Sequence, residues 1–439
     1  MLSLPSCGRD SSQGAFSVRD SSGVRIVSNP SAVAGDSGCP SVDSVPALAV
    51  GGADAEGPYD VLRVAGALRL ADGGVVVLNA ATSELRLFDR SGRYTRTFGR
   101  AGTGPGEFRN PAGLRWYGVD TLMLSDCATA RVTLLGSDGR LIAGIGLRGF
   151  LGGVLLGRLA DGSFVFSTGA AYSPGAQPGR RRDPAKVVRV SREGTVLDTL
   201  GTFPGSEALV EGDAHRVMVT SAPFGHNTFF TMANGSVFAA DNAEYRVRTY
   251  AEGRRLERIV ERAFEPVPLT AAEVEREKAE RTSRITDPRY REQLGQMYRS
   301  DRHPETLPVH GRVVVDADGW LWVRAYSDAP GGSIAWDVYD AAGRLRCSAP
   351  LPSALSVQEI GRDFLLGTLR DSDGVEQVQL YEVRRAGSPR RGAVGVLSHA
   401  RAPRRLCSPL FCSQPRRTLP LGRPVMPPRA PAGSRSSAS

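Results

Sequence analysis

The sequence predicts an all-β fold, a six-bladed β-propeller of four-stranded antiparallel blades. Three observations predict it. A unit of four short apolar strands recurs six times, the turns inside each unit carry Asp-Gly, Asn-Gly or similar pairs, and the copies without insertions are spaced by about 40–50 residues, as propeller blades are. The six copies cover residues 62–98, 112–145, 154–200, 227–260, 311–348 and 355–383.

Each copy has the composition that strands and tight turns require. The expected strands are short and rich in β-branched or aromatic residues, and the turns contain the glycine that a positive φ favours. In the first copy these turns are Asp72-Gly73 and Ser91-Gly92. A β-helix would need much shorter coils, and an immunoglobulin-like sandwich would not repeat internally, so the pattern favours a propeller.

The sixth copy lacks a fourth strand, and the start of the chain offers one. The segment Gly23–Ser28 is strand-like and belongs to no copy, so we expect it to pair with Gln377–Val383. Such pairing would close the ring and remove an edge that is otherwise open to aggregation. The propeller is therefore predicted to span residues 21–385.

The formal charge of +9 is concentrated in the last part of the chain. From Arg384 onward there are 12 arginines and no acidic residue, which leaves the rest of the chain at −3. A basic nucleic-acid-binding groove on the propeller is therefore not supported. Residues 386–439 are rich in Arg, Pro and Ser, and we expect a disordered tail. A basic arm for nucleic acid or anionic lipid and a frameshifted terminus are the alternatives.

The first 20 residues are expected to be a tether. An ordinary signal peptide is not visible, but Leu4-Pro5-Ser6-Cys7, followed by a Gly, Asp and Ser run, resembles the end of a truncated bacterial lipoprotein signal. On that interpretation Cys7 carries lipid and the protein is in the periplasm or on the cell surface. A frayed terminus with a chance cysteine is the alternative. The remaining cysteines show no metal-ligand spacing, and they allow one disulfide without identifying it.

Residues 261–308 interrupt the repeat between the fourth and fifth copies. A capping box at Thr270–Glu273 predicts a helix start, and Asp287-Pro288 predicts a second. The first helix should carry the i,i+4 ion pairs Glu277–Arg281 and Glu280–Arg284. The second helix should bury an apolar stripe formed by Tyr290, Leu294, Met297 and Tyr298. Two roles fit the insertion: a lid or partner-binding arm over the channel, and a packing decoration.

The run Arg180–Arg182 lies in a loop of the third copy. An exposed turn is favoured for it over an anion-binding site.

A junction motif adds a resemblance to a known family. The segment Gly102–Phe108, followed by Pro111 and Gly113, resembles the NHL-repeat junction GxGPGEFxxPxG, and Asp126 with Arg131-Val132 resembles the strand end of that repeat. The body of the chain resembles the bacterial 6-bladed beta-propeller family, whose members are often lipoproteins. The resemblance implies a fold and a tendency towards export, and it supplies no catalytic residues.

No catalytic motif is present in the sequence. There is no HExxH, HxH or GxSxG, and the glycines of Gly102–Phe108 precede no strand-to-helix turn that could hold a nucleotide. A lactonase-like hydrolase with Ca²⁺ in the channel is the alternative function, and its oxygen ligands would be Asn79, Asp126 and Asp241. Strand-end Asp and Asn side chains more often cap the following turn.

We therefore expect a monomeric, non-enzymatic binding or scaffold propeller, exported and tethered, without a cofactor and without a nucleic-acid partner. Its ligand would be a protein, peptide or glycan bound by loops at one mouth of the channel. The candidate ligand-binding residues are Asp126, Asp241, Asn242, Arg324, Tyr326, Tyr298, His226 and His310.

Overall fold

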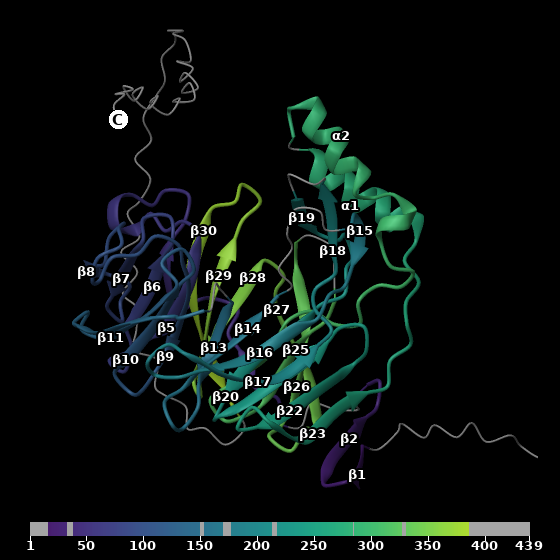
Figure 1. Ribbon diagram of the computed structural model, residues 1–439, viewed down its shortest axis with the longest axis horizontal. Coiled ribbons are helices and arrows are strands. Elements are labelled where there is room, and N and C mark those ends of the chain that lie inside the picture. Colours follow the sequence, from purple (N-terminus) through teal and green to yellow (C-terminus); the bar gives the residue numbers. More distant parts are fainter. Residues whose placement is uncertain are drawn as a thin grey trace, which may run out of the picture. The chain divides into compact units, whose positions relative to one another are not determined.

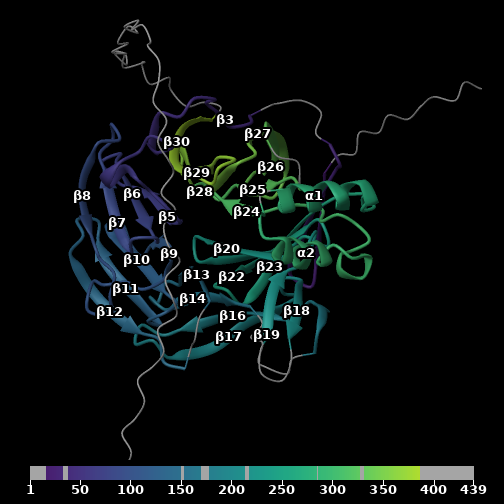
Figure 2. The same cartoon turned by 90° about the horizontal axis from the view of Figure 1, so that it is seen from above.

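Six blades of four antiparallel strands each form a closed ring (Figures 1 and 2). The computed structural model describes residues 16–32, 38–149, 153–169, 177–212, 217–283, 285–326 and 331–385. The first strands of successive blades contact each other around the whole ring, from β5 through β9, β13, β20, β24 and β28 back to β5. The predicted six-bladed propeller is therefore confirmed.

The blades follow the chain in order. Blade one contains β5 (Val64–Arg69), β6 (Val75–Asn79), β7 (Glu84–Phe88) and β8 (Tyr94–Phe98), and blade two contains β9 (Pro111–Trp116), β10 (Thr121–Asp126), β11 (Arg131–Gly136) and β12 (Leu141–Gly146). Blade three contains β13 (Val154–Arg158), β14 (Phe164–Thr168), β16 (Ala185–Val190) and β17 (Val196–Phe203), and blade four contains β20 (Thr228–Ala233), β21 (Ser236–Asp241), β22 (Arg246–Ala251) and β23 (Arg255–Arg262). Blade five contains β24 (Val313–Val315), β25 (Leu321–Arg324), β26 (Ser333–Tyr339) and β27 (Leu345–Pro352), and blade six contains β28 (Leu355–Ile360), β29 (Phe364–Arg370), β30 (Glu376–Arg384) and β4 (Leu48–Gly51).

The turns form for the reason the sequence indicated. Gly73 has φ +90°, a conformation that costs a residue with a Cβ atom, and the preceding Asp72 carboxylate accepts a hydrogen bond from the Gly74 backbone N–H at 2.9 Å. Asp-Gly at this turn therefore supplies both the backbone freedom and the cap.

An N-terminal strand completes blade six, but it is not the predicted segment Gly23–Ser28. The segment Gly23–Ser28 does not pair with β30; it falls in β2 (Val24–Asn29), which pairs in parallel with β23 of blade four and in a hairpin with β1 (Ser17–Ser21). Blade six is completed instead by β4, antiparallel to β30, and by the two-residue β3 (Ser41–Val42). Val50 of β4 is 1% exposed, so this short strand does contribute to the core.

Asn29 explains why β2 lies on the outside of blade four. Its amide donates to the Gly343 carbonyl at 3.0 Å and accepts from the Leu345 backbone N–H at 2.7 Å, so one buried side chain links the N-terminal hairpin to blade five. Buried polar groups need such partners. The parallel pairing has no turn that could reveal it in the sequence.

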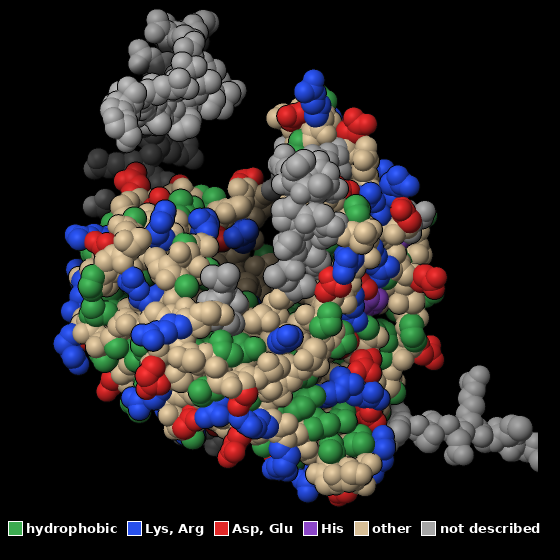
Figure 3. All heavy atoms as spheres, viewed as in Figure 1, with side chains coloured by type: hydrophobic (Ala, Val, Ile, Leu, Met, Phe, Trp, Pro, Cys, Tyr) green, Lys and Arg blue, Asp and Glu red, His purple; other side chains and the backbone are tan. Residues whose placement is uncertain are grey.

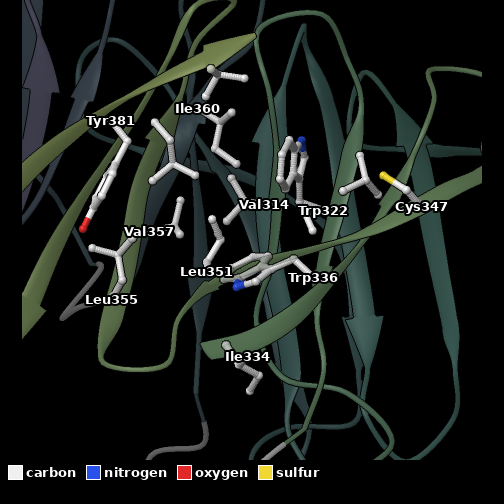
Figure 4. Packing of buried hydrophobic residues seen from close by; sticks show 14 residues of the cluster. Val314, Trp322, Ile334, Trp336, Cys347, Leu351, Leu355, Val357, Ile360 and Tyr381 are labelled. Atoms are coloured by element: carbon white, nitrogen blue, oxygen red, sulfur yellow. The ribbon is translucent and has the colours of Figure 1, made fainter. Parts of the chain in front are cut away.

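Apolar contacts between neighbouring blades form the core. Between blades five and six, Val314, Trp322 and Trp336 pack against Leu355, Val357, Ile360 and Tyr381 (Figure 4). Burying each of the two indoles contributes on the order of 3–5 kcal/mol.

A disulfide joins Cys39, just before β3, to Cys347 in β27, with the two Cα atoms 5.7 Å apart. It ties the N-terminal segment that closes blade six to blade five. Cys127 is free, and among the cysteines of the described ranges it is the unpaired one.

Two additions lie on one face of the ring. The first is a three-stranded sheet of β15 (Gly179–Arg181), β18 (Ala208–Gly212) and β19 (Val217–Ser221), which the sequence did not reveal. Arg180–Arg182 is therefore not an exposed turn: each arginine is paired, Arg180 with Glu207, Arg181 with Asp183 and Arg182 with Asp241.

The second addition is the predicted helical insertion, with α1 (Ala271–Ser283), α2 (Pro288–Gln296) and the 3-10 turn η2 (Ser300–Arg302). The capping box is confirmed, because the Thr270 N–H donates to the Glu273 carboxylate and the Glu273 N–H donates to the Thr270 hydroxyl. The N-cap at Asp287 and the Glu277–Arg281 ion pair are also confirmed. Arg284 lies outside the described residues.

The apolar stripe of α2 is only partly buried. Tyr298, after the helix, is buried and packs with Val274 and Phe224, and Met297 lies against this cluster, but Tyr290 is 57% exposed, contrary to prediction. The insertion contacts the three-stranded sheet through an ion pair of Arg302 with Glu211. Figure 1 shows both additions together at the top of the view.

No helix in the described ranges is long and apolar enough to cross a membrane. Residues 1–15 of the predicted tether, with Cys7, and the predicted tail of residues 386–439 lie outside those ranges. Residues 17–20, also assigned to the tether, instead belong to strand β1.

Candidate functional site

The side chains of the strand-end residues Asn79, Asp126 and Asp241 are engaged in hydrogen bonds within the fold, and Asp126 and Asp241 cap the turns that follow them. The Asp126 carboxylate is 2% exposed and accepts hydrogen bonds from four backbone N–H groups, those of Arg109, Asn110, Ala128 and Thr129. Its oxygens are therefore fully engaged with the blade junction.

The other two strand-end residues are also engaged, Asn79 with the segment before blade one and Asp241 with the turn that follows it. Asn79 accepts from the Leu62 N–H and donates to the Asp60 carbonyl, and Asp241 accepts from the Ala243 N–H and from Arg182. No group of three or more His, Cys, Asp or Glu residues in the described part of the chain could hold a metal ion. The three residues proposed for calcium thus belong to separate turns, and they do not fit a shared metal site.

A cavity of about 400 Å³ opens at the mouth of the channel, where the first strands of blades four, five and six begin. We call it the channel-mouth cavity. It brings together four of the eight candidate residues, Asn242, His310, Arg324 and Tyr326. Its other lining includes Phe229, Arg312, Trp336, Ser353, Ala354 and Ser356. In Figure 3 the same face is hollowed, with Lys or Arg side chains at the edge of the hollow.

Asn242 and His310 form the wall on the side of blade four. Asn242 accepts from the Asn227 N–H at 2.6 Å and donates to the His310 carbonyl at 3.2 Å. The His310 ring is fully buried against Tyr245 and Phe229, and its Nδ1 lies 2.7 Å from the Gly311 carbonyl oxygen. Burial lowers the pKa of His310, so the ring is neutral at pH 7.

Two arginines form the wall on the side of blade five. Arg324 ends β25, and its Nη2 donates to the Ser353 carbonyl at 3.4 Å; Arg312 precedes β24, and its Nη1 donates to the Ser356 hydroxyl at 3.4 Å. Both partners belong to the start of blade six. Burial lowers the pKa of both guanidinium groups, and both remain charged at pH 7.

Deeper in the channel lie Arg115 of blade two and Glu359 of blade six. Burial, together with the charge of Arg312, lowers the pKa of Arg115 to about 10, while Glu359 opposes that shift. Burial raises the pKa of Glu359 to about 7, although the Arg69 backbone N–H donates to its carboxylate at 2.9 Å. Glu359 is thus a carboxyl group that titrates near neutral pH.

His226 lies elsewhere on the same face, in a cluster with Glu207 and Arg180. Burial alone would raise the pKa of Glu207, but hydrogen bonds from His226 and Arg180 outweigh it and lower the pKa to about 2. The Arg180 guanidinium also donates to the His303 carbonyl at 3.2 Å. This cluster therefore joins the three-stranded sheet, the insertion and blade four.

A second cavity of about 510 Å³ lies between the cluster of His226, Glu207 and Arg180 and blade three, and it shares Phe229 with the channel-mouth cavity.

Tyr298 packs inside the insertion, where burial raises its pKa to about 12. Tyr326 packs against the apolar cluster of Tyr298, Val274 and Phe224, and it also lines the channel-mouth cavity. It therefore connects the insertion to the cavity.

Residues 61–115 match the model of the DUF5128 family, described as 6-bladed beta-propeller. The six sheets and the closed order of their first strands agree with that description. The chain is a 6-bladed beta-propeller. No curated protein sequence matches it.

This propeller is similar to several solved structures. A Bacteroides fragilis protein described as exported has 14% identity and a TM-score of 0.46, covering 82% of this chain and 99% of its own. A DUF4221 member from Bacteroides vulgatus has 9% identity and a TM-score of 0.41, with 79% and 99% covered. Regucalcin, a calcium-binding protein from Agrobacterium tumefaciens, has 16% identity and a TM-score of 0.34, with 81% and 96% covered. Similarity at this level carries no inference about activity.

Four lining residues of the channel were missed in the sequence. Arg312, Trp336, Arg115 and Glu359 come from three different blades. Arg115 and Glu359 did leave a signal, because each is a charged residue inside a short, otherwise mainly uncharged first strand, Pro111–Trp116 and Leu355–Ile360. In a propeller the first strand of each blade borders the central channel, where a charged side chain can be accommodated.

Proposed function

We propose that this propeller is a non-enzymatic binding protein that holds part of a protein, peptide or glycan ligand in the channel-mouth cavity. One observation carries the proposal: side chains from blades four, five and six line a single cavity of about 400 Å³. Ligand pockets typically have volumes of about 300–1,000 Å³ and combine aromatic walls with a few placed polar groups. Phe229, Trp336 and Tyr326 supply the aromatic walls, and Asn242 and Arg324 supply polar groups.

A binding role fits this chemistry better than a catalytic one. Glu359 is the carboxyl group whose pKa lies near 7, but the described residues that act on it are Arg69, Trp116 and Arg115, and none of them is a histidine, cysteine or lysine. The histidine of the cavity, His310, has its Nδ1 against a backbone carbonyl. A nucleophile with an adjacent base is therefore not assembled within the described part of the cavity.

Filling the cavity tests the proposal. Ala354 is exposed at the cavity rim, so Ala354→Trp should occupy the cavity while it keeps both arginines. Ala342→Trp, at an exposed turn of blade five outside the cavity lining, is the matched control. Thermal unfolding would be followed with pools of tetrapeptides and of malto- and cello-oligosaccharides as probes.

We expect at least one pool to stabilise the wild type and Ala342→Trp but not Ala354→Trp. A ligand at about 100 times its Kd stabilises a protein by about 2.7 kcal/mol, which is readily measured. Equal stabilisation of all three proteins, or of none, would contradict the proposal.

We also propose that the protein is exported and tethered through Cys7. The Cys39–Cys347 disulfide supports export, because disulfides persist mainly in oxidising compartments. In a bacterial host, Cys7→Ser should move the protein from the membrane fraction to the soluble fraction, whereas Cys127→Ser should not. Recovery of both variants in the same fraction as the wild type would contradict the tether.

A further inference from the structure

We infer that the channel-mouth cavity recognises a carboxylate or phosphate group on the ligand, through Arg312 and Arg324. This inference rests on the proposed binding function and adds the chemical class of the group that is bound. It is argued from the pairing of the arginines, the charge of the channel and the polar groups that surround the cavity.

Arg312 and Arg324 lack carboxylate partners among the described residues. Several partly buried arginines elsewhere on the ring are paired with acids, as Arg182 is with Asp241 and Arg385 with Asp316 at 2.7 Å. The two cavity arginines have instead one long hydrogen bond each, at 3.4 Å, to a serine carbonyl and a serine hydroxyl. A guanidinium withdrawn from water without an ion-pair partner is costly, and a bound anion would offset that cost.

The charge deeper in the channel does not neutralise them. Glu359 acts on Arg115, and no carboxylate contributes to the pKa of Arg312 or Arg324. Arg115 adds a third positive charge, and it lies close enough to Arg312 for the charge of Arg312 to lower the pKa of Arg115. The Asp241 and Asp337 carboxylates, which act on His310, are paired with Arg182 and Arg262. Arg115, Arg312 and Arg324 thus stand against Glu359, which is itself partly protonated near pH 7. The mouth of the channel therefore favours an anion over a cation.

The cavity wall offers a further donor. Trp336 is 1% exposed, and its indole N–H has no hydrogen-bond partner among the described residues. An indole nitrogen can only donate, so it adds to the preference for an acceptor such as an oxyanion. Figure 4 shows the Trp336 nitrogen on the side of Leu355, which also lines the cavity.

The geometry of the guanidinium group narrows the class of ligand. Arginine presents parallel N–H donors that match the two oxygens of a carboxylate or phosphate, and such charge-assisted bonds are about twice as strong as neutral ones. A cavity of about 400 Å³ admits a small acid or one acidic end of a larger ligand. Extended nucleic acid does not suit it, because the arginines lie inside a pocket and not along a groove.

Calorimetry on the full chain tests the inference, with succinate and inorganic phosphate as probes and sodium chloride at matched ionic strength as the reference. The variant Arg312→Gln/Arg324→Gln removes both cavity charges. Arg90→Gln/Arg96→Gln is the matched control, because it removes two charges at exposed positions of blade one. We expect at least one oxyanion to bind the wild type, about tenfold or more loss of affinity in the cavity variant, and a change within about twofold in the control.

The outcomes separate the inference from the function it rests on. Tighter binding of succinate would identify a carboxylate, and tighter binding of phosphate would identify a phosphate. Equal losses in both double variants, or no oxyanion binding at millimolar concentration, would overturn the inference. If the neutral oligosaccharide or peptide pools then still stabilise the wild type but not Ala354→Trp, the proposed function stands alone; if they do not, both fail.

Discussion

Polar side chains occur in two contrasting settings on the same face of the ring. At the end of β10, Asp126 accepts hydrogen bonds from four backbone N–H groups. At the channel mouth, Arg312 and Arg324 each have one long hydrogen bond to blade six. Both sets of side chains are withdrawn from water, but only the Asp126 carboxylate has its hydrogen-bonding capacity filled by the protein itself.

The difference separates residues that maintain the ring from residues that can bind. A carboxylate whose lone pairs are occupied by the backbone has nothing left for a ligand, however suitable its residue type. A guanidinium in a cavity without a carboxylate has donors to spare. Hydrogen-bond occupancy is therefore a better guide to the site than residue type or position at a strand end.

Asp126→Ala should have the largest effect on stability. It leaves four backbone N–H groups without their acceptor, and each buried unsatisfied group costs about 1–3 kcal/mol, so we expect the free energy of unfolding to fall by about 3 kcal/mol or more. Urea unfolding measures it. Ligand binding by the folded fraction should be unchanged.

Arg312→Gln is the matched variant from the other setting, and it should not lower the free energy of unfolding by more than about 0.5 kcal/mol, because it removes a buried charge that has no ion-pair partner. The contrast would break down if Asp126→Ala were tolerated but lost binding, or if Arg312→Gln unfolded the protein.

Glu359→Gln should have a smaller effect that depends on pH. Burial raises the pKa of Glu359 from 4.5 to about 7, so between these values the folded protein retains a proton that the unfolded chain releases. The stability of the wild type relative to Glu359→Gln should therefore fall as the pH rises from about 5 to about 8, by up to about 3 kcal/mol, and by less where water in the channel screens the charge.

Urea unfolding at a series of pH values measures this difference. Glu56→Gln, at an exposed position, is the control and should follow the wild type at every pH. A difference between the wild type and Glu359→Gln that does not vary with pH would show that the carboxyl group is not buried as described.

The sequence predicted the blades because their signals are local. Asp72-Gly73 and its counterparts mark turns within a few residues, and the capping box at Thr270 marks a helix in the same way. Ring closure is not local: Leu48–Gly51 is only four residues long, and its partner lies more than 300 positions away. The sheet of β15, β18 and β19 was missed because Gly179–Arg181 was assigned to a loop.

The candidate site was predicted in part for a related reason. Asn242, His310, Arg324 and Tyr326 lie together in the cavity because each borders the beginning or end of a strand on that face. Arg312 and Trp336 are neighbours of Arg324 within blade five, because Trp336 is its register partner in β26 and the Arg312 carbonyl accepts a hydrogen bond from the Arg324 N–H. They were missed because the repeat pattern does not show which side chains of these strands line a cavity. Asp241, His226 and Tyr298 lie close along the chain or on the same face, but their contacts are to Arg182, Glu207 and the insertion.

The pairing of Cys39 with Cys347 joins two segments that are synthesised far apart in time. The two residues are 308 positions apart, so at ribosomal rates Cys39 emerges roughly 15–60 s before its partner. Throughout that interval β4 has no β30 to pair with, and the nascent chain is an open arc with a bare edge. The covalent bond can form once Cys347 of blade five has emerged, before β28, β29 and β30 of blade six have been made, so it can hold the N-terminal segment beside blade five until β30 arrives to pair with β4.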